Sequence, residues 1–115
     1  MRIMSKICMT KDIGVEGNLF GGNMLAWMDE AAAIYARSIT GEPRMVTKKF
    51  GEIVFMKPVK VGDIVHFECG HEKIGKTSVE FMIEADVGGS YVFYTTAVFV
   101  AIDENGNKKE IGKRE

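Results

Sequence analysis

The sequence predicts an α+β fold in which one antiparallel β-sheet wraps around a single long helix. Residues 22–39 show the three- and four-residue apolar spacing of a helix, with no breaker before Gly41. After Pro43 the pattern changes to alternating residues and short turns, which is typical of strands. Strands joined by short turns pair antiparallel, and a sheet and one apolar helix bury each other by packing face to face.

Length and composition limit the classes of protein to which this chain can belong. Its 115 residues suit one domain over positions 1–115, and its formal charge of −1 gives no general attraction to nucleic acid or anionic lipid. No apolar run approaches the roughly 20 residues that span a bilayer, and the first residues lack the apolar core of a signal peptide. Cys8 and Cys69 belong to no Cys-x-x-Cys pair, so we expect buried thiols rather than a disulfide or a metal site. We therefore expect a cytoplasmic protein that contacts neither nucleic acid nor membrane.

The first part of the chain is expected to hold a short strand, a loop and the helix. Residues 2–9 form the short strand, and residues 11–17 form a loop whose glycines permit positive φ. Gly41 ends the helix, and Pro43 prevents its resumption. The apolar face of the predicted helix consists of Met24, Leu25, Met28, Ala31, Ala32, Tyr35 and Ile39.

Four strands are predicted after the helix, over residues 45–57, 64–72, 77–87 and 91–102. The last strand is apolar on both faces, so we expect it at the centre of the sheet or at an interface, and we expect dimerisation. Residues 103–107 form a polar turn, and the charged remainder through residue 115 is expected to fray. In the second and third strands, alternation gives two apolar sets, Val65, Phe67 and Cys69, and Val79, Phe81, Ile83 and Ala85.

Asp29 lies inside the second turn of the predicted helix, between Met28 and a run of alanines. A carboxylate in apolar surroundings costs several kcal/mol unless it is paired, hydrogen-bonded or protonated. Such a group in the central element is a candidate for chemistry. The alternative is that Asp29 points to solvent beside Glu30.

Five short motifs between residues 17 and 79 carry a resemblance to a known family, which covers roughly residues 7–102. They are Gly17-x-x-Phe20-Gly21-Gly22, Met28-Asp29-x-Ala31-Ala32, Val46-Thr47, Ile53-x-Phe55-x-x-Pro58-Val59-x-x-Gly62-Asp63 and Gly75-x-Thr77-Ser78-Val79. In this order and spacing the chain resembles the hotdog-fold acyl-CoA thioesterases. The resemblance is to the small bacterial acyl-CoA thioester hydrolases, which are related to the cytosolic acyl-CoA hydrolases of animals. In that fold an antiparallel sheet wraps one central helix, as the strand and helix patterns predict.

The resemblance implies hydrolysis of an acyl-CoA to a free carboxylic acid and coenzyme A, without metal or organic cofactor. It also implies a homodimer joined sheet edge to sheet edge, and a hexamer built as a trimer of dimers is common in this branch. His66 and His71 lie far from the helix start, where the hotdog dehydratases carry their histidine, so a dehydratase is disfavoured. The chain also shows no metal-ligand spacing and no serine nucleophile on a sharp elbow.

The resemblance assigns roles to individual residues. Asp29 would act as general base or as nucleophile. The backbone amides of Gly21 and Gly22 would polarise the thioester carbonyl, although the two glycines alone could also serve only a sharp turn. An acyl tunnel between helix and sheet would be lined by residues such as Met24, Met28, Phe55 and Met56. The residues expected to bind substrate or coenzyme A are Asn18, Phe20, Val59, Lys60, Gly75, Lys76, Thr77 and Ser78, where each lysine could equally be solvated surface.

One departure from the family pattern concerns position 14. The family carries an asparagine there, which faces the catalytic aspartate across the dimer interface, whereas this chain has Gly14. Asp12 and Asn18 are the two nearby side chains that could replace it. The alternative function is therefore a non-catalytic acyl-CoA binding or sensing module on the same fold.

Overall fold

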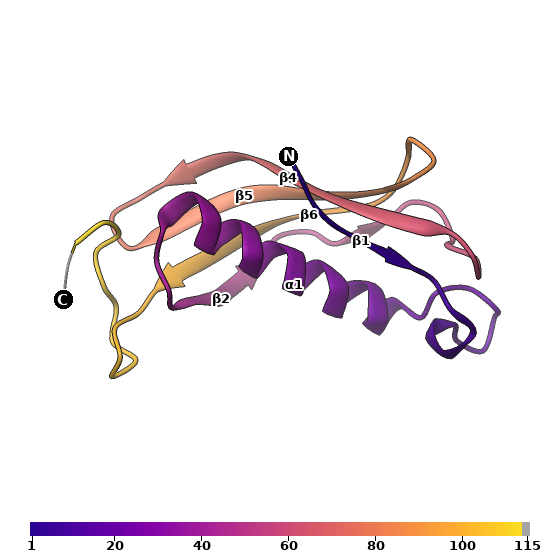
Figure 1. The fold of residues 1–115 in the computed structure, drawn as a ribbon, viewed down its shortest axis with the longest axis horizontal. Helices are drawn as coiled ribbons and strands as arrows, with labels where there is room; N and C mark the ends of the chain where they lie inside the picture. Colours follow the sequence, from indigo (N-terminus) through magenta and orange to yellow (C-terminus); the bar gives the residue numbers. More distant parts are fainter. Residues whose placement is uncertain (114–115) are drawn as a thin grey trace.

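The structure, a computed structural model, describes residues 1–113 and contains one sheet that arches over one long helix (Figure 1). The helix is α1 (Gly21–Thr40), and a short 3-10 helix, η1 (Thr10–Asp12), precedes it. The strands are β1 (Arg2–Ile7), β2 (Met45–Phe50), β3 (Val54–Phe55), β4 (Ile64–Ile74), β5 (Ser78–Val87) and β6 (Ser90–Ala101). This is the hotdog arrangement that the sequence predicts.

The strands lie in the order β1-β4-β5-β6-β2, with β3 also paired to β6, and every pairing is antiparallel. β6 therefore lies inside the sheet, as its two apolar faces predict. The predicted strand over residues 45–57 is wrong in one respect, because it is divided into β2 and β3. Gly51 lies at the division, where an added Cβ atom would come within 2.2 Å of Thr96 Oγ1. This close approach requires glycine.

The pairing of β2 also differs from what the short turns of the sequence suggest. Instead of forming a hairpin with the next strand along the chain, β2 and β3 pair with β6 on the other side of the sheet. The connection from β3 to β4 passes the start of the helix, where the Leu19 amide donates to the Val59 carbonyl at 2.8 Å. This connection brings the loop after Pro58 to the N-terminus of α1.

The helix packs its small and flexible residues against the sheet. Its end is as predicted: Gly41 has φ 71°, and its amide donates to the Arg37 carbonyl at 2.8 Å. Leu25 and Ile39, expected on the apolar face, are only half-buried. The helix residues that are buried are Met24, Met28, Ala31, Ala32, Tyr35 and Ala36.

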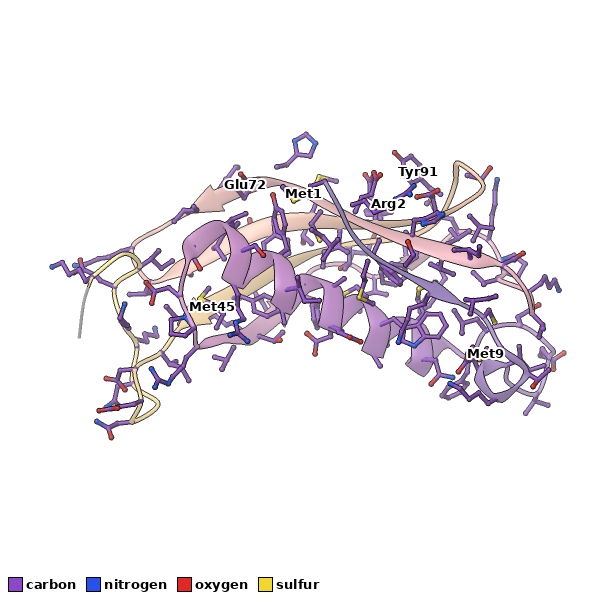
Figure 2. The ribbon with its side chains drawn as sticks, in the orientation of Figure 1. Met1, Arg2, Met9, Met45, Glu72 and Tyr91 are labelled. Atoms are coloured by element: carbon purple, nitrogen blue, oxygen red, sulfur yellow. The ribbon has the colours of Figure 1, made fainter. Side chains whose placement is uncertain are left out.

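The inner face of the sheet carries the apolar sets that alternation predicts for β4 and β5, and all of these residues are buried. Phe81 is central to this layer: its ring meets the Tyr35 ring edge-on at 4.9 Å and stacks on Phe99 at 5.8 Å. The Tyr35 hydroxyl donates to the carboxylate of Glu72 in β4 at 2.5 Å. Glu72 is labelled in Figure 2. Cys8 and Cys69 are free and buried as expected, and burial raises the pKa of Cys69 to about 12.

The segment after β6 is ordered through residue 113, which corrects the expectation of a frayed tail. We call residues 102–113 the C-terminal strap. The Ile111 amide donates to the Lys76 carbonyl at 2.8 Å, and the Lys109 amide donates to the Ala101 carbonyl at 2.9 Å. Residues 114–115, which were part of the same expectation, lie outside the described chain. Within residues 1–113, no helix combines the length and the hydropathy that a membrane span requires.

A buried carboxylate anchors the strap. Glu42 is 6% exposed; its Oε1 atom accepts a hydrogen bond from Lys109 Nζ at 2.7 Å, and its Oε2 atom accepts one from the Gly112 amide at 2.8 Å. The donated bonds from Lys109 and Gly112 hold the pKa of Glu42 below its ordinary value. The strap is therefore attached to the C-terminal end of α1 through Glu42.

Replacement of Glu42 by glutamine is expected to lower the free energy of unfolding by about 2 kcal/mol, because Lys109 is left without its anion in a poorly solvated position. Glu104→Gln is the matched control, since Glu104 is an exposed carboxylate in the same strap. Urea unfolding at pH 7 measures the difference. Equal stability of the two variants would show that the Glu42 contacts do not hold the strap.

The stabilisation by Glu42 is also expected to depend on pH. A carboxyl group whose pKa is lower in the folded than in the unfolded state stabilises fully above its unfolded value, near 4.5 here, and loses this contribution as the pH falls through the folded value. The stability difference between the unsubstituted protein and Glu42→Gln should thus shrink as the pH is lowered below 4.5. Urea titrations of both proteins at several acidic pH values test this, and a difference that is constant with pH contradicts it.

Candidate active site

A cavity of about 330 Å³ lies at the N-terminal end of α1. One wall comes from the turn before the helix and its first residues, and the other from β3 and the loop that follows it. Three of the residues predicted to line an acyl tunnel, Met24, Phe55 and Met56, line this cavity. Met28, the fourth, is fully buried and does not reach the cavity. The lining is predominantly apolar. The full set is Asn18, Leu19, Gly21, Met24, Phe55, Met56, Lys57, Pro58 and Val59.

The helix begins beside this cavity without a side-chain cap. Phe20 is the N-cap residue, and its carbonyl accepts hydrogen bonds from the Asn23 and Met24 amides. In the described part of the chain, the Gly21 and Gly22 amides have no hydrogen-bond acceptor. These two donors lie at the positive end of the helix dipole, so they can bind an anion or a developing negative charge.

The two glycines differ in their surroundings. A Cβ atom added at Gly22 would lie 2.7 Å from the Phe20 ring, while one at Gly21 would meet the Phe55 ring at an ordinary 3.6 Å. The Phe20 ring also faces Gly14, where an added Cβ atom would lie 3.3 Å from it. The ring is 58% exposed and lies beside the cavity rather than on its wall. The glycines thus provide both the close approach of Phe20 and two unobstructed amides.

Asp29 is half-buried and faces β2. The Thr47 hydroxyl of β2 donates to Asp29 Oδ1 at 2.9 Å, so the carboxylate is held toward the sheet and does not simply extend into solvent beside Glu30. A β-bulge follows Thr47, because Thr47 pairs with Phe99 and Lys49 with Val98. Thr47, like Lys48 and Lys49, is exposed, whereas Phe50 is half-buried.

Thr47 is a functional candidate to which the sequence assigned no role. Val46-Thr47 was recognised only as part of a motif, and no spacing rule connects residue 47 with residue 29. A hydroxyl on an edge strand, opposite a helical carboxylate, is the signal that could have suggested the contact. That signal requires the register of β2 on β6, which is non-local.

Three of the predicted binding residues meet at the cavity. Lys60 Nζ donates to Asn18 Oδ1 at 2.5 Å, and the Leu19 amide donates to the Val59 carbonyl at 2.8 Å. The loop after Pro58 is thereby fixed to the turn that precedes α1. Asn18 and Val59 lie on the cavity wall, and Lys60, which is exposed, contacts Asn18.

The other predicted binding residues, Gly75, Lys76, Thr77 and Ser78, lie in and just after the β4–β5 turn. This turn lies at the end of the molecule that carries the C-terminus, opposite the start of α1 (Figure 1). A helix of 20 residues is about 30 Å long, so one chain does not bring the two groups together. Lys76 instead accepts a backbone bond from Ile111 of the strap, and its ammonium lies 3.6 Å from the Glu110 carboxylate.

Of the two side chains that could replace an asparagine at position 14, Asp12 is already occupied. It is buried; its Oδ2 atom accepts a hydrogen bond from the Met9 amide at 2.9 Å, and its Oδ1 atom accepts one from Lys11 Nζ at 2.8 Å. Figure 2 shows Met9 at the end of the molecule where α1 begins. Hydrogen bonds from Lys11 and Met9 lower the pKa of Asp12. The geometry therefore leaves Asn18 as the candidate.

Comparison with known proteins gives consistent matches. Residues 16–99 match the profile of the Thioesterase superfamily. An uncharacterized acyl-CoA thioester hydrolase of Buchnera aphidicola subsp. Schizaphis graminum is 35% identical, over 95% of this chain and 87% of the relative. HI0827, a hexameric broad specificity acyl-coenzyme A thioesterase, has been solved as a variant in which an aspartate is replaced by alanine. That structure is similar to this one with a TM-score of 0.91 and 27% sequence identity, over 100% of this chain and 88% of that chain.

An acyl-CoA hydrolase of Staphylococcus aureus provides a comparison for position 14. Its variant with an asparagine replaced by alanine, in complex with coenzyme A, is 26% identical with a TM-score of 0.87, over 94% of this chain and 68% of that one. Another variant of the same enzyme has an aspartate replaced by alanine, and that aspartate lies fifteen residues after the asparagine. Asp29 lies at the same separation from Gly14.

Proposed function

Since the chain belongs to the Thioesterase superfamily, among its hotdog-fold bacterial acyl-CoA thioester hydrolases, we propose that it hydrolyses an acyl-CoA to a free carboxylic acid and coenzyme A. One observation carries this proposal beyond family membership. An apolar cavity opens beside two unpaired amides at the start of a helix. Such a site accepts an apolar acyl chain and a carbonyl oxygen at the same time.

The Gly21 and Gly22 amides are proposed to stabilise the oxyanion that forms when the thioester carbonyl is attacked. Each lies at the positive end of α1 and lacks an acceptor in the described chain, so no existing bond must break before it binds the oxygen. A preorganised donor of this kind lowers an activation barrier by about 3 kcal/mol. Met24, Phe55 and Met56 on the cavity wall would contact the acyl chain.

Asp29 is proposed as the catalytic carboxylate, oriented by Thr47. As a general base it takes a proton from water while the water oxygen attacks the carbonyl carbon. As a nucleophile its own oxygen attacks, coenzyme A leaves, and water then opens the mixed anhydride. In the first route Asp29 then passes this proton to the departing thiolate, and in the second the thiolate takes a proton from the acid that forms when water opens the anhydride. Both routes thus form the carboxylic acid or its carboxylate and release coenzyme A as its thiol. The hydrogen bond from Thr47 leaves the second carboxylate oxygen available for either role.

The complete site is proposed to form between two copies of the chain. Asp29 follows Gly21 by eight residues along α1, which is about 12 Å at 1.5 Å per residue, so within one chain the two groups cannot act on the same carbonyl. The edge strand β2 carries Thr47 and pairs only with β6 in the described chain. We propose a homodimer joined through this edge, assembled further into a hexamer like that of HI0827.

The same arrangement provides a binding site for coenzyme A. Val59 and Lys60 lie at the cavity of one chain, and the turn with Lys76, Thr77 and Ser78 lies at the far end of the same chain. An antiparallel partner would bring its own far end toward the cavity. The lysines and hydroxyls are suitable donors to the phosphates and the pantetheine amides.

A second function, acyl-CoA binding without hydrolysis, is favoured by one observation. Gly14 has no side chain at the position where the Staphylococcus aureus hydrolase has an asparagine at the matching separation from an aspartate. Turnover measurements on the unsubstituted protein distinguish the two functions.

Replacement of Asp29 by asparagine is expected to lower turnover of acyl-CoA by a factor of about 100 to 10,000, because a neutral amide can neither accept a proton from water nor attack the carbonyl. Release of free thiol from short-, medium- and long-chain acyl-CoAs measures turnover, and titration calorimetry with coenzyme A should give unchanged affinity. Glu30→Gln, the neighbouring exposed carboxylate on α1, is the control and should retain full activity. Binding of coenzyme A without turnover by the unsubstituted protein would support the binding module instead.

Replacement of Thr47 by valine is expected to lower kcat by roughly tenfold and to leave KM nearly unchanged. Valine keeps the shape of threonine but removes the side-chain hydrogen bond to Asp29 that the described chain provides. Thr47→Ser, which retains the hydroxyl, should restore most of kcat. If Thr47→Val is fully active, or if both variants lose activity equally, Thr47 does not act through its hydroxyl.

A further inference from the structure

Asn18 is the only uncharged polar side chain among the residues that line the cavity at the start of α1. It is half-buried, and it lies three residues before Gly21. We propose that its carboxamide is an additional donor to the thioester carbonyl oxygen, beside the helix amides. This inference rests on the proposed function, because it names a substrate contact within the same site.

The contact with Lys60 determines which atom of the carboxamide is available. A lysine ammonium donates hydrogen bonds and accepts none, so the oxygen of Asn18 must be the atom that faces Lys60 Nζ, at 2.5 Å. The nitrogen Nδ2 then carries both remaining hydrogens, and it has no acceptor in the described part of the chain. The group that Asn18 can offer a ligand is therefore a donor. Its polarity suits a carbonyl oxygen and does not suit another donor.

The backbone holds Asn18 in place. Gly17, just before it, has φ 81°, a left-handed conformation that suits glycine, and the Asn18 carbonyl accepts a bond from the Gly14 amide at 2.8 Å. The Leu19 amide is bound to Val59 on the opposite loop. A donor with a fixed backbone and a fixed oxygen loses little entropy when it binds. Such preorganisation is what transition-state stabilisation requires.

The absence of a side chain at Gly14 leaves room for this role. The two candidates to replace an amide there are Asp12, which is occupied by Met9 and Lys11, and Asn18, which reaches the cavity. The surrounding wall of Leu19, Met24 and Phe55 is apolar and suits the acyl chain. The carbonyl group of the thioester then lies beside the polar donors, which are the helix amides and Asn18 Nδ2. The thioester oxygen is thus the acceptor that this position fits best.

The test is the activity of Asn18→Leu, which keeps a similar volume but has no donor, together with Asn18→Asp, which can still pair with Lys60 and so keeps the loop contact. Both variants are expected to lose about 100-fold in kcat for acyl-CoA hydrolysis, the loss typical of removing one oxyanion donor. Affinity for coenzyme A, measured by titration calorimetry, should stay within twofold. Asn105→Ala, an exposed asparagine in the strap, is the control and should change neither quantity.

The outcomes separate this inference from the function on which it rests. Unchanged kcat in both Asn18 variants, with an active unsubstituted protein, overturns the inference and leaves the hydrolase proposal intact. A change confined to KM and coenzyme A affinity also overturns it, since Asn18 would then hold the pantetheine chain. Absence of turnover in the unsubstituted protein overturns both proposals. A matched fall in kcat and in the melting temperature of Asn18→Leu alone, with Asn18→Asp active, would indicate a purely structural role.

Discussion

The close packing of α1 on the sheet is the constraint on which the rest of this structure depends. Met28, Ala31, Ala32 and Ala36 have no exposed surface, and three of these four side chains are single methyl groups. Small residues let the helix backbone approach the sheet closely, and larger ones would push it away and open voids. Because the helix is fixed on the sheet in this way, the positions of its two ends and of its solvent-facing side relative to the sheet are fixed as well. Its start faces the cavity, its end carries the anchor of the strap, and Asp29 faces β2.

The proposed chemistry is divided between two parts of one chain. The proposed donors of Gly21 and Asn18 lie at the cavity, and the carboxylate of Asp29 lies more than two helical turns away beside Thr47. If each cavity takes its carboxylate from a neighbouring copy, assembly becomes a condition for catalysis and not only for stability. The exposed β2 edge, at which no second strand is paired in the described chain, is suited to that assembly.

The sequence predicted the features that depend on local patterns. The helix and most strands followed from periodicity, and Gly41 correctly marked the helix end. The sequence did not predict the features that depend on contacts between distant residues. These features are the pairing of β2 with β6, the division at Gly51 and the hydrogen-bonded strap. For the same reason the Thr47–Asp29 and Asn18–Lys60 contacts emerged only from the three-dimensional structure, whereas Asp29, the glycine pair, Asn18 and Lys60 were each singled out through the family resemblance.

The position of β6 has a consequence for how the chain is made. β6 follows the other described strands in the chain and pairs with β5 on one side and with β2 and β3 on the other, so the sheet cannot be completed until β6 has left the ribosome. The helix is synthesised early, and its apolar face has no complete partner during that interval. A nascent chain in this state exposes a surface that chaperones bind and that aggregation exploits. Vectorial synthesis therefore makes β6 the strand that completes the sheet, and a chain that stops before residue 90 can pair β1, β4 and β5 but leaves β2 and β3 without their partner strand.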